Sequence, residues 1–172
     1  MKRLLIILAG AILIPSFGIT GSSQTDRVYQ APGGKFKLNL ISEWREVSYA
    51  DAVGRQKTEF VYRDRSEGLL RVSREKLSGR PLSNLVQDEE ENLRLYRAGY
   101  ETASKEPFGA QGSLSGIRFS FYNLDGGKRI AGTNYYLQDG DSVWILKFTG
   151  KRGVIDTIRN ITDQMARSFK PE

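Results

Sequence analysis

The chain has 172 residues and a formal net charge of +6, from 26 lysines and arginines against 20 aspartates and glutamates. It contains no histidine and no cysteine, which excludes disulfides, thiol catalysis, histidine general bases and metal centres built from these ligands. We therefore expect no metal and no cofactor. Basic and acidic residues are interspersed without a basic block, so nucleic-acid binding is not expected either.

The N-terminus has the pattern of an export signal. Lys2 and Arg3 precede an apolar run of eleven residues, and small residues follow. We predict a signal peptide over residues 1–23, a mature domain over residues 24–172, and a periplasmic or secreted location. An uncleaved anchor is the alternative, because no further charge appears before Thr25; it would give a weak membrane association through the N-terminus.

The first part of the mature chain has the alternation of β-strands. Residues 36–40 alternate apolar and polar side chains after a turn. Residues 57–63 and 69–77 show a similar alternation, and the short link between them, which ends at Gly68, has the length of a hairpin connection. We predict one short strand followed by an antiparallel pair.

The apolar residues then take helical spacing over residues 82–96, with Pro81 at the start and Gly99 at the end. Glu89 is unusual because it lies in the middle of the apolar stripe, where a buried carboxylate would have a perturbed pKa and mark a site. Two structural alternatives remain. Glu89 lies at the edge of the stripe and reaches solvent, or it pairs with an arginine of the sheet such as Arg118.

The second half of the chain contains more strand-like runs, separated by turns rich in glycine, and then a final helix. The strand-like runs cover residues 100–108, 114–124, 128–137 and 142–149, and the helix covers residues 154–169. We therefore predict an α+β domain, in which an antiparallel β-sheet of six to seven strands is flanked by two helices in α/β/α layers.

Local runs and the order of elements carry a family resemblance. The runs are Phe36-Lys37-Leu38-Asn39-Leu40 followed by Trp44, and Ser142-Val143-Trp144-Ile145-Leu146. With a central helix, a meander that has a tryptophan in its last strand, and a closing helix, residues 29–169 resemble an exported bacterial branch of the PsbP-like superfamily. That superfamily includes the extrinsic photosystem II protein and a Ran-binding factor.

The resemblance implies a fold that binds other proteins and has no active site common to the family. Metal-supporting roles of the photosynthetic branch involve histidine, and this chain has none. Neither a metal role nor a photosystem role is therefore carried over.

Two groups of residues are candidate binding sites. Lys151, Arg152 and Gly153 precede the final helix and could hold an anion there. The second group consists of cations on the predicted hairpin and of Tyr135. Alternation directs Tyr135 and its neighbour Tyr136 to opposite faces of their strand, so that one of the two can be exposed. This possible surface for an acidic partner or anionic lipid head groups comprises Arg63, Arg65, Arg71, Arg74 and Tyr135. The structural alternatives are an exposed turn and a salt-bridged strand surface.

No serine or carboxylate lies in the context of a known catalytic motif, so we do not expect an enzyme. We predict an exported, monomeric accessory or protein-binding module with a protein partner in the cell envelope. The alternative is a carrier for a small lipophilic ligand, which requires a sizeable apolar pocket. A hydrolase, a further alternative, would need a cleft that holds a serine or carboxylate beside a perturbed lysine or glutamate.

Overall fold

The computed structural model describes residues 26–172. The predicted signal peptide and its alternative, the N-terminal anchor, lie outside these residues and stay predictions. Within residues 26–172, no helix is both long and apolar enough to cross a membrane.

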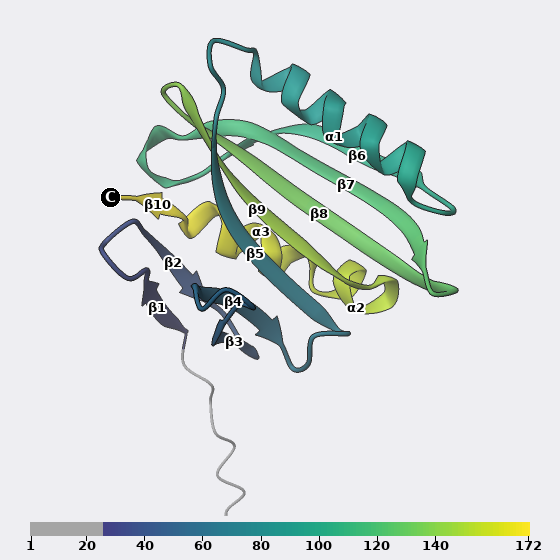
Figure 1. The fold of residues 1–172 in the computed structure, drawn as a ribbon, viewed down its shortest axis with the longest axis horizontal. Helices are drawn as coiled ribbons and strands as arrows, with labels where there is room; N and C mark the ends of the chain where they lie inside the picture. The colour runs from purple at the N-terminus through teal and green to yellow at the C-terminus, as the bar shows by residue number, and fades with distance from the viewer. Residues whose placement is uncertain (1–25) are drawn as a thin grey trace, which may run out of the picture.

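Strands and helices follow one another in the order drawn in Figure 1. They are β1 (Arg27–Gln30), β2 (Phe36–Leu40), β3 (Trp44–Ala50), β4 (Gln56–Tyr62), β5 (Gly68–Lys76), α1 (Leu82–Tyr96), β6 (Glu101–Gly109), a short 3-10 turn (Gln111–Ser113), β7 (Ser115–Asp125), β8 (Lys128–Asp139), β9 (Ser142–Lys151), α2 (Arg152–Thr157), α3 (Arg159–Ser168) and β10 (Lys170–Pro171).

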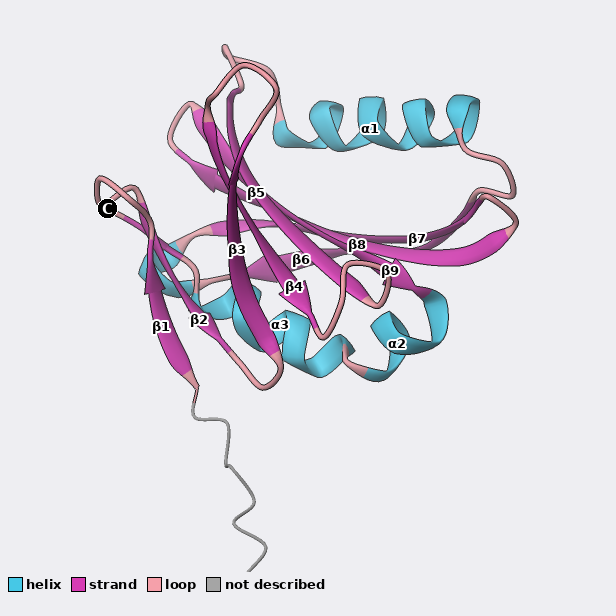
Figure 2. Ribbon diagram, turned by 60° about the horizontal axis from the view of Figure 1, so that its bottom comes forward, coloured by secondary structure: helices cyan, strands magenta, loops and turns pink. Residues whose placement is uncertain are grey.

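The strands form two antiparallel sheets. The large sheet has seven strands in the order β3-β4-β5-β9-β8-β7-β6, and the small one has the order β1-β2-β10. In Figure 2, α1 lies over one face of the large sheet, and α2 and α3 lie over the other. The predicted α+β class and layered architecture are therefore confirmed. The predicted strand 36–40 also forms, but it belongs to the small sheet, and β3 supplies the seventh strand of the large one.

Alternation along the strands divides the core into two apolar clusters, one on each face of the large sheet. The larger cluster lies on the α2 and α3 face and includes the small sheet; among its members are Leu38, Phe60, Leu70, Tyr135, Trp144, Phe148, Met165 and Phe169. The smaller cluster lies under α1 and comprises Leu77, Val86, Phe119, Phe121, Tyr136, Val143 and Ile145.

The prediction that Tyr135 lies on an interaction surface is wrong. Tyr135 and Tyr136 do point to opposite faces of β8, but helices cover both faces, so both side chains are buried. The hydroxyl of Tyr135 donates a hydrogen bond to Oδ1 of Asp163 in α3, at 2.6 Å. Tyr135 is thus a core residue that holds α3 on the sheet.

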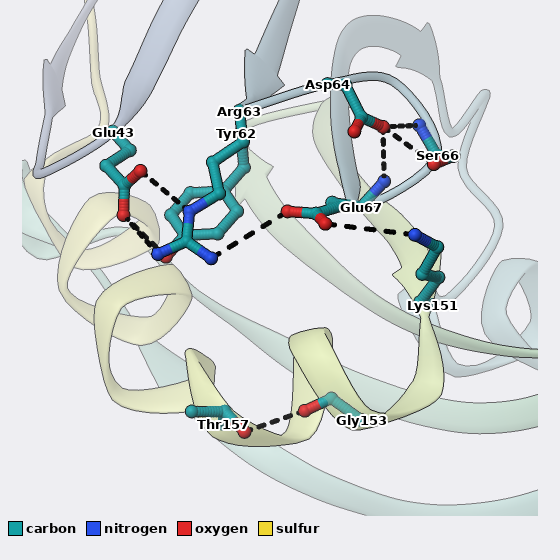
Figure 3. Close-up of polar contacts among 9 residues, drawn as sticks. All are labelled: Glu43, Tyr62, Arg63, Asp64, Ser66, Glu67, Lys151, Gly153 and Thr157. Atoms are coloured by element: carbon teal, nitrogen blue, oxygen red, sulfur yellow. Dashed lines mark hydrogen bonds and ion pairs between the residues drawn. The ribbon is translucent and has the colours of Figure 1, made fainter.

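The predicted final helix is divided into α2 and α3. The backbone of Ile158, between them, has φ −93° and ψ 14°, which departs from helical values. Just before it, the hydroxyl of Thr157 donates to the carbonyl of Gly153 at 2.7 Å (Figure 3). Such bonds from a threonine to the preceding turn favour a bend. The apolar stripe still packs inward, because Ile155, Ile158 and Met165 are buried.

Candidate functional site

A cleft of about 670 Å³ separates the C-terminal half of α1 from the large sheet. The N-terminal half of the helix packs on the sheet through Val86, which is fully buried. Beyond it, Glu89, Leu93 and Arg97 follow at a spacing of four residues and face the cleft. The other walls come from the β4–β5 turn, β5, β9, β8 and β7, with Arg65, Ser66, Leu69, Arg71, Phe121, Asn123, Asp125, Gly126, Lys128, Ile130, Asn134, Lys147, Thr149, Gly150 and Lys151.

The sheet carries small residues beside the cleft, where β8 and β9 pair. Gly132, Thr149 and Gly150 occupy neighbouring positions of β8 and β9 on either side of the shared ladder. At Gly132 the ring of Phe121 lies where a side chain would begin, and at Gly150 the carbonyl oxygen of Glu67 does so. These close approaches require glycine at both positions, because the ring and the carbonyl oxygen already occupy the space of a Cβ atom.

Positive charge exceeds negative charge on the walls of the cleft. The lining cations are Arg65, Arg71, Arg97, Lys128, Lys147 and Lys151, and the lining carboxylates are Glu89 and Asp125. Two further carboxylates lie behind the wall: Glu59 pairs with both Arg65 and Arg71, and Glu67 lies 3.8 Å from Lys151. Among the described residues, Arg97 and Lys128 form no ion pair, so the cleft keeps a surplus of positive charge.

Glu59 anchors the β5 side of the cleft from beneath. It is only 3% exposed, and its carboxylate lies 2.8 Å from Arg71 and 2.9 Å from Arg65. Burial by itself would raise the pKa of Glu59, but the hydrogen bond and charge of Arg71 and the charge of Arg65 outweigh it. The pKa therefore lies below its ordinary value, and the carboxylate stays charged.

Glu59→Gln should make the stability of the protein less sensitive to acid. Folding lowers the pKa of Glu59. The carboxylate therefore contributes fully to folding stability above its pKa in the unfolded chain, about 4.3, and this contribution is lost as the pH falls through its lower pKa in the folded protein. We expect the variant to lose about 1–2 kcal/mol at pH 7 and to approach wild type near pH 3. Urea unfolding at several pH values measures this. Glu46→Gln, at an exposed pair with Arg27, is the matched control, and parallel pH profiles for wild type and Glu59→Gln would refute the assignment.

The β4–β5 turn forms one end of the cleft and is held by its own polar contacts (Figure 3). Oδ1 of Asp64 accepts hydrogen bonds from the backbone of Ser66 at 2.7 Å and of Glu67 at 3.0 Å, and from the Ser66 hydroxyl at 2.7 Å. These bonds hold the pKa of Asp64 below its usual range. The backbone N–H of Lys151 donates to the carbonyl of Ser66, so the turn is fixed to the end of β9.

Four of the residues singled out in the sequence meet at this cleft. Arg65 and Arg71 line its β5 side, Lys151 lies at the end of β9, and Glu89 faces it from α1. Glu89 is not fully buried, since its side chain is 28% exposed, and it does not reach Arg118, which pairs with Asp163 and Glu106. Instead it pairs with Lys147 of β9 at 2.7 Å.

The other candidate residues lie elsewhere. Arg63 turns to Glu43, with both bonds at 2.7 Å (Figure 3). Arg74 lies on the opposite face of β5, with its guanidinium 5.1 Å from the centre of the Trp144 ring. Arg152 lies 3.8 Å from the ring of Tyr122, on the α2 side. Lys151 faces the cleft whereas Arg152 lies over Tyr122, so the two cations of the anion site predicted for Lys151, Arg152 and Gly153 point away from each other.

Four polar or charged residues of the cleft are not among the candidate site residues predicted from the sequence. Lys147 follows Val143 and Ile145 on one face of β9, so a charge in that alternation was the available signal. Asn134 gives a similar signal on β8, where it shares a face with Tyr136. Arg97 and Lys128 resemble ordinary surface cations, and nothing in the sequence distinguishes them. Within residues 26–172, no group of carboxylates is arranged to hold a metal ion.

Fold and cleft together define the class of the protein: an α+β domain with the PsbP/Mog1-like fold and a basic cleft under its central helix. Three solved structures illustrate the fold, which is the one that the sequence resemblance implied. The sequence matches no protein-family model and no curated protein.

The cyanobacterial PsbP of Synechocystis aligns with a TM-score of 0.61 at 15% identity, over 91% of this chain and 99% of that one. The Ran-binding protein Mog1p of Saccharomyces cerevisiae aligns with a TM-score of 0.59 at 11% identity, over 86% and 95%. LpqN of Mycobacterium tuberculosis, which is involved in cell envelope biogenesis, aligns with a TM-score of 0.58 at 11% identity, over 85% and 90%.

Proposed function

We propose that this protein is a non-catalytic binding module that holds an acidic segment of a partner protein in the cleft under α1. The observation that carries the proposal is the charge of the cleft: six lining cations face two lining carboxylates and the two carboxylates behind the wall, and Arg97 and Lys128 are free of ion pairs within residues 26–172. Complementary charge steers such encounters and selects the partner. A protein partner suits the fold, since Mog1p, which shares it, is a Ran-binding protein.

The proposal includes export, with the partner in the cell envelope. Its support is the N-terminal pattern of two cations, an apolar run and small residues. LpqN, a protein involved in cell envelope biogenesis, has the same fold.

The chemistry of the cleft favours binding over catalysis. Its serine, Ser66, donates its hydroxyl to Oδ1 of Asp64, and the same oxygen accepts from the backbone N–H groups of Ser66 and Glu67, so this carboxylate holds the turn. Lys147 is paired with Glu89. A carrier for a small lipophilic ligand is less favoured, because this cleft is open to solvent and edged by cations instead of being an enclosed apolar chamber.

Reversing the charge of the two unpaired cations should strongly reduce capture of the partner. We expect Arg97→Glu with Lys128→Glu to lower the yield of cross-linked partner about tenfold, because two attractions become repulsions. The measurement is carbodiimide cross-linking in the envelope fraction, since this reagent joins lysine amines to carboxylates, with the linked residues located by mass spectrometry. Links from Lys128, Lys147 or Lys151 to acidic residues of one protein are the expected result.

The matched control reverses two exposed cations far from the cleft, Lys35 and Lys170, which form no ion pair within residues 26–172. This control should capture the partner as wild type does. Equal capture by the cleft variant and by wild type would refute the proposed site.

A further inference from the structure

The floor of the cleft is apolar although its rim is charged. Leu69, Leu93 and Ile130 are only half-buried. Together with Phe121 they line the cleft between α1 and the sheet. Part of each of the three half-buried side chains is exposed to solvent. Burial of such surface by a bound group favours binding by about 25 cal/mol for each Å² removed from water.

The cations lie on two sides of this floor. Arg65 and Arg71 lie on the β5 side, whereas Arg97 directly follows α1 and Lys128 begins β8. β9 lies between β5 and β8, so the two sides are about 10 Å apart at the usual strand spacing. A ligand with one anionic head group reaches one side only. A chain segment with carboxylates on either side of an apolar residue reaches both.

The inner end of the cleft contains an unsatisfied polar group. Asn134 is 1% exposed, and its amide nitrogen donates to the hydroxyl of Tyr136 at 3.3 Å. Its carbonyl oxygen has no hydrogen-bond partner. Turning the amide over would satisfy that oxygen and leave the nitrogen unpaired instead. Since buried polar groups are nearly always paired, this position is suited to a polar group brought by a ligand.

We propose that the segment bound in the cleft carries carboxylates on both sides of an apolar or aromatic side chain, which packs on Leu93, Phe121 and Ile130. This inference rests on the proposed function and names the partner's chemistry. The flanking carboxylates pair with the cations on the two sides, and a backbone polar group of the segment meets Asn134.

Three capped heptapeptides test the proposal by fluorescence anisotropy at about 50 mM salt, where exposed charges are weakly screened. The first has a central phenylalanine with three alternating aspartates and glutamates on each side. The second has serine at the centre, and the third keeps the phenylalanine with every carboxylate replaced by its amide. We expect the first to bind at least about tenfold more tightly than either of the others.

Two variants of α1 assign the effect to the floor. Leu93→Ser should remove the advantage of phenylalanine over serine, whereas Leu95→Ser, on the exposed side of the same helix, should keep it. Amide NMR spectra of the unmodified protein give a second measurement that needs no variant. Addition of the first peptide should shift the side-chain NH₂ signals of Asn134 and the backbone signal of Ile130.

The outcomes separate this inference from the proposed function. Equal affinity for the phenylalanine and serine peptides, with both weakened by Arg97→Glu and Lys128→Glu, overturns the inference and leaves the function standing. Equal affinity for the acidic phenylalanine peptide and its neutral amide form overturns the requirement for flanking carboxylates and, with it, the acidic segment of the proposed function. Absence of binding by either acidic peptide refutes the function as well, and tighter binding of dodecyl phosphate than of any peptide assigns the cleft to a lipid-like anion.

Discussion

Replacing Trp144 by alanine should lower the free energy of unfolding by about 3–5 kcal/mol, as for other buried tryptophans. Trp144 lies in β9 and is 5% exposed. Its ring contacts Phe36 of the small sheet and Phe169 after α3, with ring centres 5.7 Å and 5.3 Å away. Removing it therefore opens a cavity at the point where the large sheet, the small sheet and the end of α3 meet.

Urea denaturation followed by far-UV circular dichroism measures this loss. Trp144→Phe keeps an aromatic ring and should cost clearly less, although it loses the indole N–H that donates to Asp139 at 3.3 Å. Tyr96→Ala, at a side chain that is 79% exposed, is the control and should change stability by less than about 0.5 kcal/mol. An unchanged midpoint for Trp144→Ala would show that the aromatic cluster does not support the fold.

Local periodicity predicted the parts of the fold whose pattern is set by a buried face. Strand β8 and its neighbours alternate cleanly, and their glycine turns have hairpin length. Strand β3 was not predicted, because most side chains of this edge strand face solvent and leave no alternation of apolar and polar residues. The small sheet could not be predicted at all, since it joins β1 and β2 with β10 from the opposite end of the chain. Pairing over such a distance leaves no local pattern.

The candidate site was likewise predictable only in part: local patterns identified single residues, but not how the fold brings them together. Glu89 was noticed because a carboxylate interrupts an apolar stripe, and Arg65 and Arg71 because cations cluster on a hairpin. Their meeting with Lys151 depends on β9 lying between β5 and β8, a strand order that no local pattern specifies. The close packing of Phe121 and of the β4–β5 turn beside the cleft depends in turn on Gly132 and Gly150, whose role becomes clear only when Phe121 and Glu67 are seen against them.

Asp163→Ala should lower stability by about 3–5 kcal/mol, because it leaves a buried charge without its partner. Asp163 holds α3 on the sheet through both carboxylate oxygens. One accepts from Arg118 at 2.6 Å and the other from Tyr135 at 2.6 Å. Burial raises the pKa of Tyr135, so its phenol stays protonated and donates. Without Asp163, Arg118 keeps only Glu106, which is largely exposed.

Two further variants show whether the loss comes from the unpaired charge. Asp156→Ala, at an exposed pair with Arg152 on α2, is the matched control and should cost less than about 1 kcal/mol. Arg118→Met added to Asp163→Ala should recover part of the stability, since a buried arginine without its partner is worse than an apolar side chain of similar length. If the double variant is no more stable than Asp163→Ala alone, the loss comes from packing of α3 and the buried-charge explanation is wrong.

Because Asp163 lies on the α3 face and the cleft lies on the α1 face, the same variant separates folding from binding. Below its unfolding transition, Asp163→Ala should bind the acidic phenylalanine heptapeptide with wild-type affinity, whereas Arg97→Glu with Lys128→Glu should bind it weakly and unfold normally. Opposite responses in the two assays would place stability and recognition on opposite faces of one sheet. A parallel loss of both in Asp163→Ala would instead mean that the cleft depends on how α3 is seated.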